Sequence, residues 1–488
     1  MAKKTWTSWF TPKKKSSTRK YEGASKSKRL SRWLTQSTSA NAEVGTGIIT
    51  LRDRARDLRR NNPYAAKGIQ VITSNVVGHG IQTQFRNGNA DTLEAMWKEW
   101  AESKNIDFDG RNNIYGLQRL VMDAIAESGE VLIRKRFNAA MKFPLQYQVL
   151  ESDFLDIQKS EAKTQDGNII IQGIEFDPQG RRVAYHLYES HPGGYDQQFF
   201  FSTLKTNRVP ASEVLHVFRV DRPGQARGVS WLAPVIVRMK DLDDFEDAQL
   251  MRQKVAACFT VFVRDISADF TDQDEECDDD LGDKVEPAMI EHLPPGKTVE
   301  FANPPAVQGY SDYTSTVLRG IAAGLGVTYE SLTGDLSRTN FSSARMGWIE
   351  FSRNVQTWRE HIMYAHFLDH AAKDFMETAA IMGVRTEGTT FVHVPPKREM
   401  IDPTKEVPAT IEAIRAGLTT LSDEIMAQGK DPEEHLEQYQ KDMAMLDELG
   451  LKLESDPRVG KGQTQPSVAE TTDETDDEGG ADETNPQN

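Results

Sequence analysis

Cysteine is scarce in this sequence, with only Cys258 and Cys277 among 488 residues. Cys277 stands inside an acidic run, a poor position for a structural disulfide, so we expect two free thiols and a reducing compartment. No stretch approaches the ~18 consecutive apolar residues of a membrane span. The first ten residues, MAKKTWTSWF, lack the apolar core of a signal peptide. The remaining composition, 38% hydrophobic and 27% charged, is typical of a soluble globular protein with polar tails.

The net charge of −16 is distributed unevenly along the chain. Residues 1–34 hold eleven Lys or Arg and a single acid, whereas residues 463–488 hold eight acids and no Lys or Arg. Like-charge runs at chain ends are usually disordered. Two interpretations of the basic arm stay open: a solvated tail, or a segment that contacts nucleic acid or an acidic partner.

Complete catalytic motifs are also lacking. The residues GKT at 296–298 resemble the end of a phosphate-binding loop, but Glu291 stands where that loop needs a glycine. His366 and His370 are four residues apart, but Phe367 replaces the glutamate that a zinc protease places after its first histidine. The sequence therefore predicts no catalytic residue, no cofactor and no metal site, and a protein that is not an enzyme.

The patterning of apolar and β-branched residues predicts an α+β fold. Strands are expected at 130–137, 145–150, 169–176, 182–188, 198–201, 261–263, 297–301 and 389–396. Helices are expected at 51–60, 64–77, 91–104, around 117–125, and at 230–258, 311–326 and 343–382, with folded structure starting near residue 46. Ser230 is the expected cap of its helix, and Pro408 is expected to interrupt a helix that starts at Asp402.

The helix expected at 343–382 gives the strongest periodic signal in the chain. Its apolar residues recur every three or four positions, which indicates one continuous buried stripe. The stripe consists of Trp348, Phe351, Val355, Trp358, Ile362, Ala365, Leu368, Ala372, Phe375 and Ala379.

Several segments, taken together and in order, resemble the lambda-like family of tailed-bacteriophage portal proteins over roughly residues 45–450. They are ARDLRRNNPYAAKGIQ at 55–70, SGEVLIR at 128–134, LQYQVLESDFL at 145–155, RVPASEVLHVFRVDRPGQARGVSWLAP at 208–234, AAGLGVTYESLTGDLSRTNFSSAR at 322–345 and DPTKEVPA at 402–409.

The resemblance implies a ring-forming portal fold with mainly helical stem, wing and crown, and with short β-strands in the wing and clip. It divides the chain into regions with the following expected bounds: a basic disordered N-terminal arm at 1–45, the wing (α/β) at 46–230, the first stem helix at 231–258, the clip at 259–310, the second stem helix at 311–328, the tunnel loop at 329–342, a long wing helix and strand at 343–400, the crown at 401–452 and an acidic disordered tail at 453–488.

The resemblance also implies a ring of about twelve subunits at one capsid vertex, a channel for packaging and ejecting DNA. The resemblance implies that residues of the tunnel loop contact DNA. The candidates are Asp335, Ser337, Arg338 and Asn340. Arg338 is the cation that would steer the duplex, although it could equally pair with Asp335 of its own or an adjacent loop.

An acidic loop at 269–283 carries nine Asp or Glu without the ligand spacing of a calcium loop. Because this loop lies in the expected clip, it is the candidate docking site for the terminase or the connector. The candidate residues are Asp272, Asp274, Glu275, Glu276, Asp278, Asp279 and Asp280.

The implied partners are further copies of the chain, the large terminase subunit, a head–tail connector or adaptor protein, the major capsid and scaffold proteins, and double-stranded DNA, with no membrane. The implied location is the virion, with host cytoplasm during assembly. Two alternatives remain. One is a capsid or adaptor protein without a channel. The other is a DNA-packaging enzyme subunit, which would need a nucleotide loop or a compact acidic metal cluster.

Overall fold

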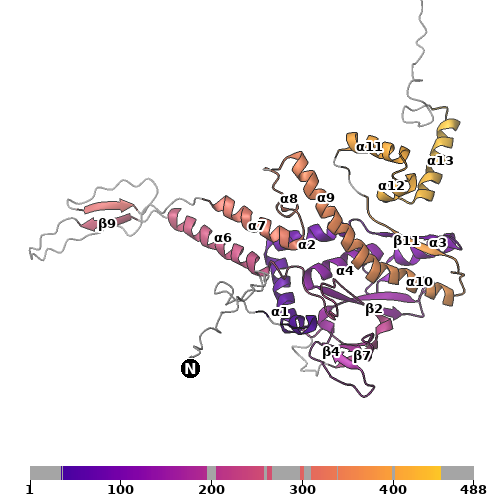
Figure 1. Ribbon diagram of the computed structural model, residues 1–488, viewed down its shortest axis with the longest axis horizontal. Helices are drawn as coiled ribbons and strands as arrows, with labels where there is room; N and C mark the ends of the chain where they lie inside the picture. The colour runs from indigo at the N-terminus through magenta and orange to yellow at the C-terminus, as the bar shows by residue number, and fades with distance from the viewer. Residues whose placement is uncertain are drawn as a thin grey trace, which may run out of the picture. The chain divides into compact units, whose positions relative to one another are not determined.

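The computed structural model describes residues 35, 37–194, 205–257, 261–265, 297–301, 309–337, 339–397, 400 and 402–451. The chain forms two compact units (Figure 1). Unit 1 comprises Met1–Gly78 and Asp91–Thr386, and unit 2 comprises His79–Ala90 and Glu387–Asn488. Within the described ranges, no helix has the length and apolar character needed to cross a bilayer.

Four helices begin unit 1: α1 (Ala40–Asn61), α2 (Pro63–Val76), α3 (Ala90–Ala101) and α4 (Ile114–Ser128). Helix α1 starts before the expected residue 46, because the Ser39 hydroxyl accepts a hydrogen bond from the Ala42 amide and caps the helix. The helix therefore begins inside the range expected for the basic arm, 1–45. Asn62 ends α1 and caps α2 by accepting from the Ala65 amide at 2.8 Å.

Two antiparallel sheets follow in unit 1. In the first sheet, β2 (Glu130–Phe137) lies between β3 (Leu145–Glu151) and β8 (Val214–Phe218). The second sheet has the order β4 (Ile169–Ile171), β5 (Ile174–Phe176), β6 (Arg182–Tyr188) and β7 (Thr206–Pro210). Short 3₁₀ turns occur at η3 (Lys104–Ile106), η4 (Ser152–Phe154) and η5 (Ala211–Glu213).

The strand expected at 169–176 is divided in two. Gln172 and Gly173 have φ angles of 51° and 86°, a left-handed backbone that turns the chain between β4 and β5. The strand expected at 198–201 lies outside the described residues.

The aromatic core of unit 1 joins α3, the first sheet and the end of the long helix. The Trp97 and Trp100 rings each lie within 5.5 Å of the Phe375 ring, centroid to centroid. The Trp100 indole donates a hydrogen bond to the Leu145 carbonyl at 2.7 Å, so its polar atom is satisfied inside the core. These contacts hold the first sheet against the end of the long helix that carries Phe375.

A buried ionic centre ties β2, β8 and the chain after β8 together. The Arg227 Nε atom donates to Glu130 at 2.9 Å, the Gly228 amide donates to it at 2.8 Å, and His216 lies at 3.0 Å. The Arg227 and Glu130 side chains are 0% and 1% exposed. Although burial raises it, the charge of Arg227 and the hydrogen bond with His216 hold the pKa of Glu130 well below its usual range.

Two helices, α6 (Ile236–Ala257) and α7 (Tyr310–Leu325), lie side by side and extend from the rest of unit 1 (Figure 1). Helix α6 does not start at Ser230, as expected, because residues 231–235 form turns in which the Val235 amide bonds to the Leu232 carbonyl. Pro234 has no backbone N–H, so it cannot donate an α-helical hydrogen bond at this point. Between the two helices, β9 (Val261–Asp265) pairs antiparallel with β10 (Lys297–Phe301).

The long helix continues for 41 residues as expected, but in three parts: α9 (Phe341–Trp358), the π-helical segment η6 (Arg359–Leu368) and α10 (Asp369–Ile381), with 18, 10 and 13 residues. In a π-helix the hydrogen bonds span five residues, so the buried face changes phase. Ala365 of the expected stripe is therefore exposed, and Met363 and Phe367 are buried. Arg359 donates to the carbonyls of Asn75 and Val76 at the end of α2.

Unit 2 pairs β1 (Gln82–Arg86) with β11 (Thr390–Val394) and adds α11 (Pro403–Arg415), α12 (Leu421–Ala427) and α13 (Pro432–Glu448). Asp402, Thr420 and Asp431 precede these helices as expected. Helix α11 continues through Pro408, so the expected interruption is wrong. Pro408 removes only the one hydrogen bond that its own N–H would have donated to the Thr404 carbonyl near the start of the helix, and Thr404 is an exposed residue.

Candidate functional site

The loop between α8 and α9 is the candidate site. Helix α8 (Tyr329–Thr333) is capped by Thr328, whose hydroxyl accepts from the Ser331 amide at 3.1 Å. It ends at Gly334, which has a φ of 74°, a left-handed conformation that favours glycine. The connecting loop therefore spans 334–340. It is shorter than the expected 329–342, because both ends of that range are helical.

Asp335 and Ser337, two of the predicted site residues, lie together in this loop. The Asp335 carboxylate accepts from the Tyr329 hydroxyl at 3.1 Å and from the Ser337 amide at 3.0 Å. The Asp335 amide in turn donates to the Thr333 hydroxyl at 3.1 Å. Asp335 thus organises the turn, and the Ser337 side chain is exposed.

Asn340, the third predicted residue that the structure describes, caps helix α9. Its side-chain oxygen accepts from the Ser343 amide at 2.8 Å, and the Ser343 hydroxyl accepts from the Asn340 amide at 3.2 Å. This reciprocal pair satisfies two backbone donors at the helix start. Sequence reasoning missed this role, although the spacing of Asn340 and Ser343 carries the signal.

The remaining predicted residues lie outside the described residues. They are Arg338, together with Asp272, Asp274, Glu275, Glu276, Asp278, Asp279 and Asp280 of the acidic loop. The pairing of Arg338 with Asp335 and the docking role of the acidic loop therefore stay predictions.

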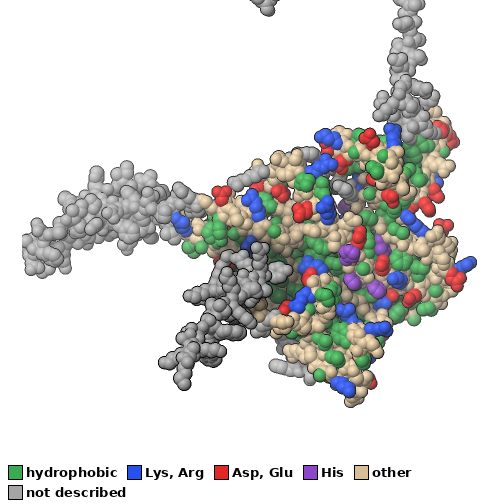
Figure 2. All heavy atoms as spheres, in the orientation of Figure 1, with side chains coloured by type: hydrophobic (Ala, Val, Ile, Leu, Met, Phe, Trp, Pro, Cys, Tyr) green, Lys and Arg blue, Asp and Glu red, His purple; other side chains and the backbone are tan. Residues whose placement is uncertain are grey.

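The loop and the start of α9 are strongly exposed. Leu336 and Met346 have 65% and 68% of their surfaces accessible. Arg345, which sequence reasoning did not single out, is an exposed cation in the second turn of α9. On the visible face of the molecule, acidic and basic side chains are interspersed (Figure 2). The described basic side chains on this face therefore do not form the continuous stripe that indicates tight nucleic-acid binding.

The pair α6 and α7 leaves apolar side chains uncovered. Phe245 of α6 lies 4.5 Å from Tyr313 and 5.8 Å from Tyr310 of α7, between ring centroids. Farther along α6, Leu250 and Met251 are 51% and 61% exposed. Within the part of the chain that the structure describes, nothing buries these two side chains, which is typical of a surface between subunits.

One group of potential metal ligands occurs among the described residues: Glu151, Asp153 and His191, whose ligand atoms lie within 4.8 Å of one another. Arg52 and Arg56 already contact Asp153 at 2.8 and 2.7 Å. Burial raises the pKa of Asp153, but the hydrogen bond and charges of these arginines lower it overall. The group is therefore an ion-pair cluster between α1 and the first sheet, and a metal would have to displace the guanidinium groups.

Comparison with known proteins adds sequence relatives along most of the chain. The chain is 27% identical over 460 residues to the "Probable portal protein" of Halomonas phage phiHAP-1, covering 89% of this chain and 88% of that protein. It is 24% identical over 479 residues to portal protein B of Escherichia phage lambda, covering 87% and 89%. Among solved structures, the neck of an empty GTA particle is similar with a TM-score of 0.48 at 13% identity, covering 78% and 94%.

The family comparison agrees with the segments singled out in the sequence. The model of phage portal proteins of the lambda family matches residues 26–359, more than half of the chain. This range includes the first sheet, both extended helices and the loop that carries Asp335 and Asn340. The chain therefore belongs to the lambda family of phage portal proteins.

Proposed function

We propose that this chain assembles into a ring of about twelve copies at one capsid vertex and that DNA enters and leaves the capsid through its channel. In this role it acts as a structural conduit and carries out no catalytic step. It is a component of the virion and assembles in the host cytoplasm. Family membership supports the portal role.

The observation that carries the proposal is the exposed pair α6 and α7. In a closed ring, each pair packs between two neighbours, so that residues such as Leu250 and Met251 become buried. In this assignment α6 and α7 form the stem, β9 and β10 belong to the clip, and residues 401–452 form the crown.

The loop 334–340 is the proposed channel loop. Asp335 and the Asn340 cap shape its two ends, so the tip residues Ser337 and Arg338 would face the duplex. A conduit must not hold the DNA, and phosphate affinity rises with the number of cations that touch it. A chain with a net charge of −16 and few loop cations meets this requirement.

The acidic loop at 269–283 is the proposed docking site for the large terminase subunit during packaging and for the connector afterwards. Capsid and scaffold proteins would contact the wing. Reversing several charges among Asp278, Asp279 and Asp280 should weaken docking to both partners, measured by co-sedimentation with assembled rings. Unchanged docking would remove this part of the proposal.

Native mass spectrometry and class-averaged electron microscopy of the full-length chain test the ring. The expected result is a ring of about twelve copies with a central hole of roughly 20 Å or more, wide enough for B-form DNA. Chains that stay monomeric even with capsid and scaffold proteins present would contradict the proposal.

A packaging assay tests the loop. Arg338→Ala should leave ring assembly intact and reduce the amount of DNA packaged or retained, because it removes one cationic ring from the channel. Arg119→Ala, which removes an exposed arginine from α4, is the matched control. Equal packaging by both variants would assign Arg338 a role other than contact with DNA.

A further inference from the structure

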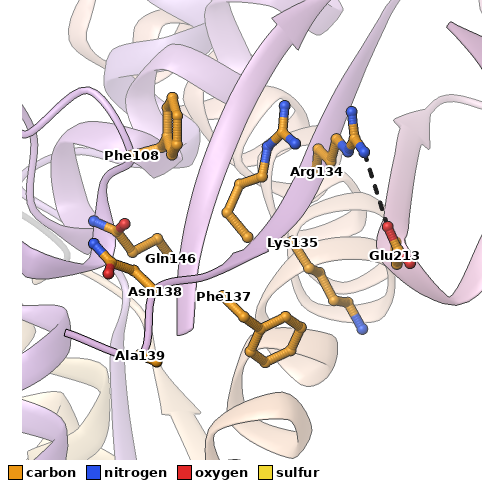
Figure 3. Close-up of a pocket in the computed structure, with 9 residues that line it drawn as sticks. Phe108, Arg134, Lys135, Phe137, Asn138, Ala139, Gln146 and Glu213 are labelled. Carbon is orange, nitrogen blue, oxygen red and sulfur yellow. Dashed lines mark ion pairs between the residues drawn. The ribbon is translucent and has the colours of Figure 1, made fainter. Parts of the chain in front are cut away.

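The end of the β2–β3 hairpin carries an open hollow of about 510 Å³ in unit 1. Figure 3 shows that it surrounds the last residues of β2. It is lined by Phe108, Arg134, Lys135, Arg136, Phe137, Asn138, Ala139, Gln146 and Glu213. We call it the hairpin hollow. Nothing in the channel role uses it.

The hairpin hollow contains an unpaired strand edge. Strand β2 pairs with β3 as far as Phe137, but with β8 only as far as Arg134. Before β8, the chain turns aside through η5 (Ala211–Glu213). Among the described residues, no strand therefore covers the backbone of 135–137 on the β8 side. Such an edge can accept one more extended segment by main-chain hydrogen bonds.

Arg134 and Arg136 supply positive charge to this edge. As alternate residues of a strand they share one face, and Arg134 points away from Lys135 and Phe137 (Figure 3). The Arg136 guanidinium donates twice to the neutral Gln148 amide oxygen, at 2.9 and 2.8 Å. Arg134 lies 4.0 Å from Glu213, at the outer limit of an ion pair. Lys135 is different, because Asp374 binds it at 2.6 Å.

Two aromatic side chains flank these cations. Phe137 is 67% exposed and Phe108 is 46% exposed, so both rings are accessible from solvent. The Arg136 guanidinium lies over the Phe108 ring, 5.5 Å from its centroid. The hollow thus offers two guanidinium groups with the Phe108 ring on one face of the strand edge and the Phe137 ring on the other.

We propose that the hairpin hollow binds the acidic C-terminal segment of this chain, residues 463–488, as an added β-strand. The segment has eight acids and no Lys or Arg, complementary to the two arginines. In Glu474-Thr475-Asp476 the acids alternate with a β-branched residue. An extended strand would therefore present both acids to Arg134 and Arg136, and Thr475 to the opposite face, near Phe137.

The proposed segment is joined to the described residues by a length of chain. The described residues end at 451, and 37 further residues follow. Fully extended, the stretch from 451 to Glu474 would span on the order of 75 Å. The other acidic run, 269–283, is joined to the fold at both ends through β9 and β10, so it is less able to lie along a second strand edge.

Duplex DNA fits the hollow less well than a peptide does. The hollow presents two arginines on one face of the strand, and the Glu213 carboxylate lies 4.0 Å from one of them, Arg134. Tight DNA binding needs on the order of six or more phosphate contacts. A strand edge with main-chain donors and acceptors, in contrast, matches an extended peptide.

A labelled peptide of residues 463–488 tests the proposal, with fluorescence anisotropy as the readout. The receptor is the full-length chain in which the eight acids of 463–488 are changed to the corresponding amides, so that its own segment does not compete. The expected result is saturable binding that weakens with salt and is lower in the chain with its natural acids. The probe is a separate peptide, so the test is independent of ring assembly and of which copy supplies the segment.

Variants on this receptor locate the site. Arg134→Gln together with Arg136→Gln should weaken peptide binding by about tenfold, and Phe137→Ser by about threefold. Arg119→Gln, the matched change on α4, should leave it unchanged. Unaltered melting temperatures would show that all variants fold.

Three outcomes would overturn the proposal. The first is the absence of saturable binding. The second is an equal loss with Arg119→Gln, which would reveal unspecific charge attraction. The third is tighter binding of a 269–283 peptide or of duplex DNA in a manner that depends on Arg134 and Arg136, since either result would assign the hollow to a different occupant.

Discussion

The buried centre at Glu130 and the loop at 334–340 use the same kinds of polar groups in opposite ways. In the centre, Arg227 and His216 surround one carboxylate that is almost completely removed from solvent. In the loop, Asp335 accepts hydrogen bonds from Tyr329 and Ser337, which are close to it in the sequence, and Ser337 is exposed. The centre holds the sheet and the chain after β8 in one arrangement. The loop is shaped locally, so its tip can change without loss of the fold.

The largest effect is expected in the buried centre. Arg227→Met should lower the free energy of unfolding by about 3–5 kcal/mol, because it leaves the Glu130 charge buried without its partner. Chemical denaturation of the isolated chain measures this. Arg222→Met, which removes a half-exposed arginine paired with Glu43, should have little effect. Similar losses in both variants would remove the contrast between buried and exposed charges.

A smaller, pH-dependent effect is expected at Glu175 in the second sheet. Hydrogen bonds from Arg208, opposed by burial, lower its pKa from 4.5 to about 2. A lowered pKa stabilises the fold above pH 4.5, and this stabilisation is lost as the pH falls towards 2. Glu175→Gln should therefore cost about 1–3 kcal/mol at pH 7 and almost nothing near pH 2. A difference that stays constant in denaturation curves across this range would contradict the assignment.

At the start of the loop, Gly334→Ala should cost about 1–2 kcal/mol, because an L-residue is strained at a φ of 74°. A methyl group at this position would meet no atom within 4 Å, so the effect is purely conformational. Gly347→Ala within α9 should instead stabilise the chain by up to about 1 kcal/mol. Thermal unfolding compares the two, and a loss in both would point to packing instead of backbone strain.

At the end of the loop, Asn340→Ala should cost about 1 kcal/mol by removing the cap of α9. Hydrogen exchange should accelerate at the Ser343 amide, which donates to Asn340. Asn340→Ser keeps a capping oxygen and should restore the protection. If the serine variant exchanges as fast as the alanine variant, Asn340 has a role beyond capping.

Much of the fold could be predicted because its signals are local. The β2 strand at 130–137 and the β10 strand at 297–301 have the expected bounds, since β-branched and aromatic residues mark them directly. The starts of α12 and α13 follow from the capping residues Thr420 and Asp431. The predicted start of a helix differs from the observed one where a single capping residue, and not the apolar pattern, sets the helix end, as Ser39 does at α1.

The site was predicted less completely for a physical reason. Asp335 and Asn340 were chosen for contact with DNA, but each has bonds within its own loop or helix that composition does not reveal. The centre around Glu130 and the hairpin hollow depend on residues that are distant in sequence, such as Arg227 and Phe108. Only the folded chain brings these residues together.

The π-helical segment η6 has a consequence for how the long helix tolerates change. Its wider hydrogen-bond span behaves as one residue inserted into an α-helix, so α9 and α10 bury faces that a regular helix would not align. Deleting one residue within 359–368 should therefore convert the segment to α-helix while α9 and α10 keep the faces that they bury. The same deletion within α9 or α10 would rotate the residues on its two sides against each other by about 100°. The π-helical segment is thus the place where the long helix can change length by one residue without reorienting the channel loop relative to the aromatic core.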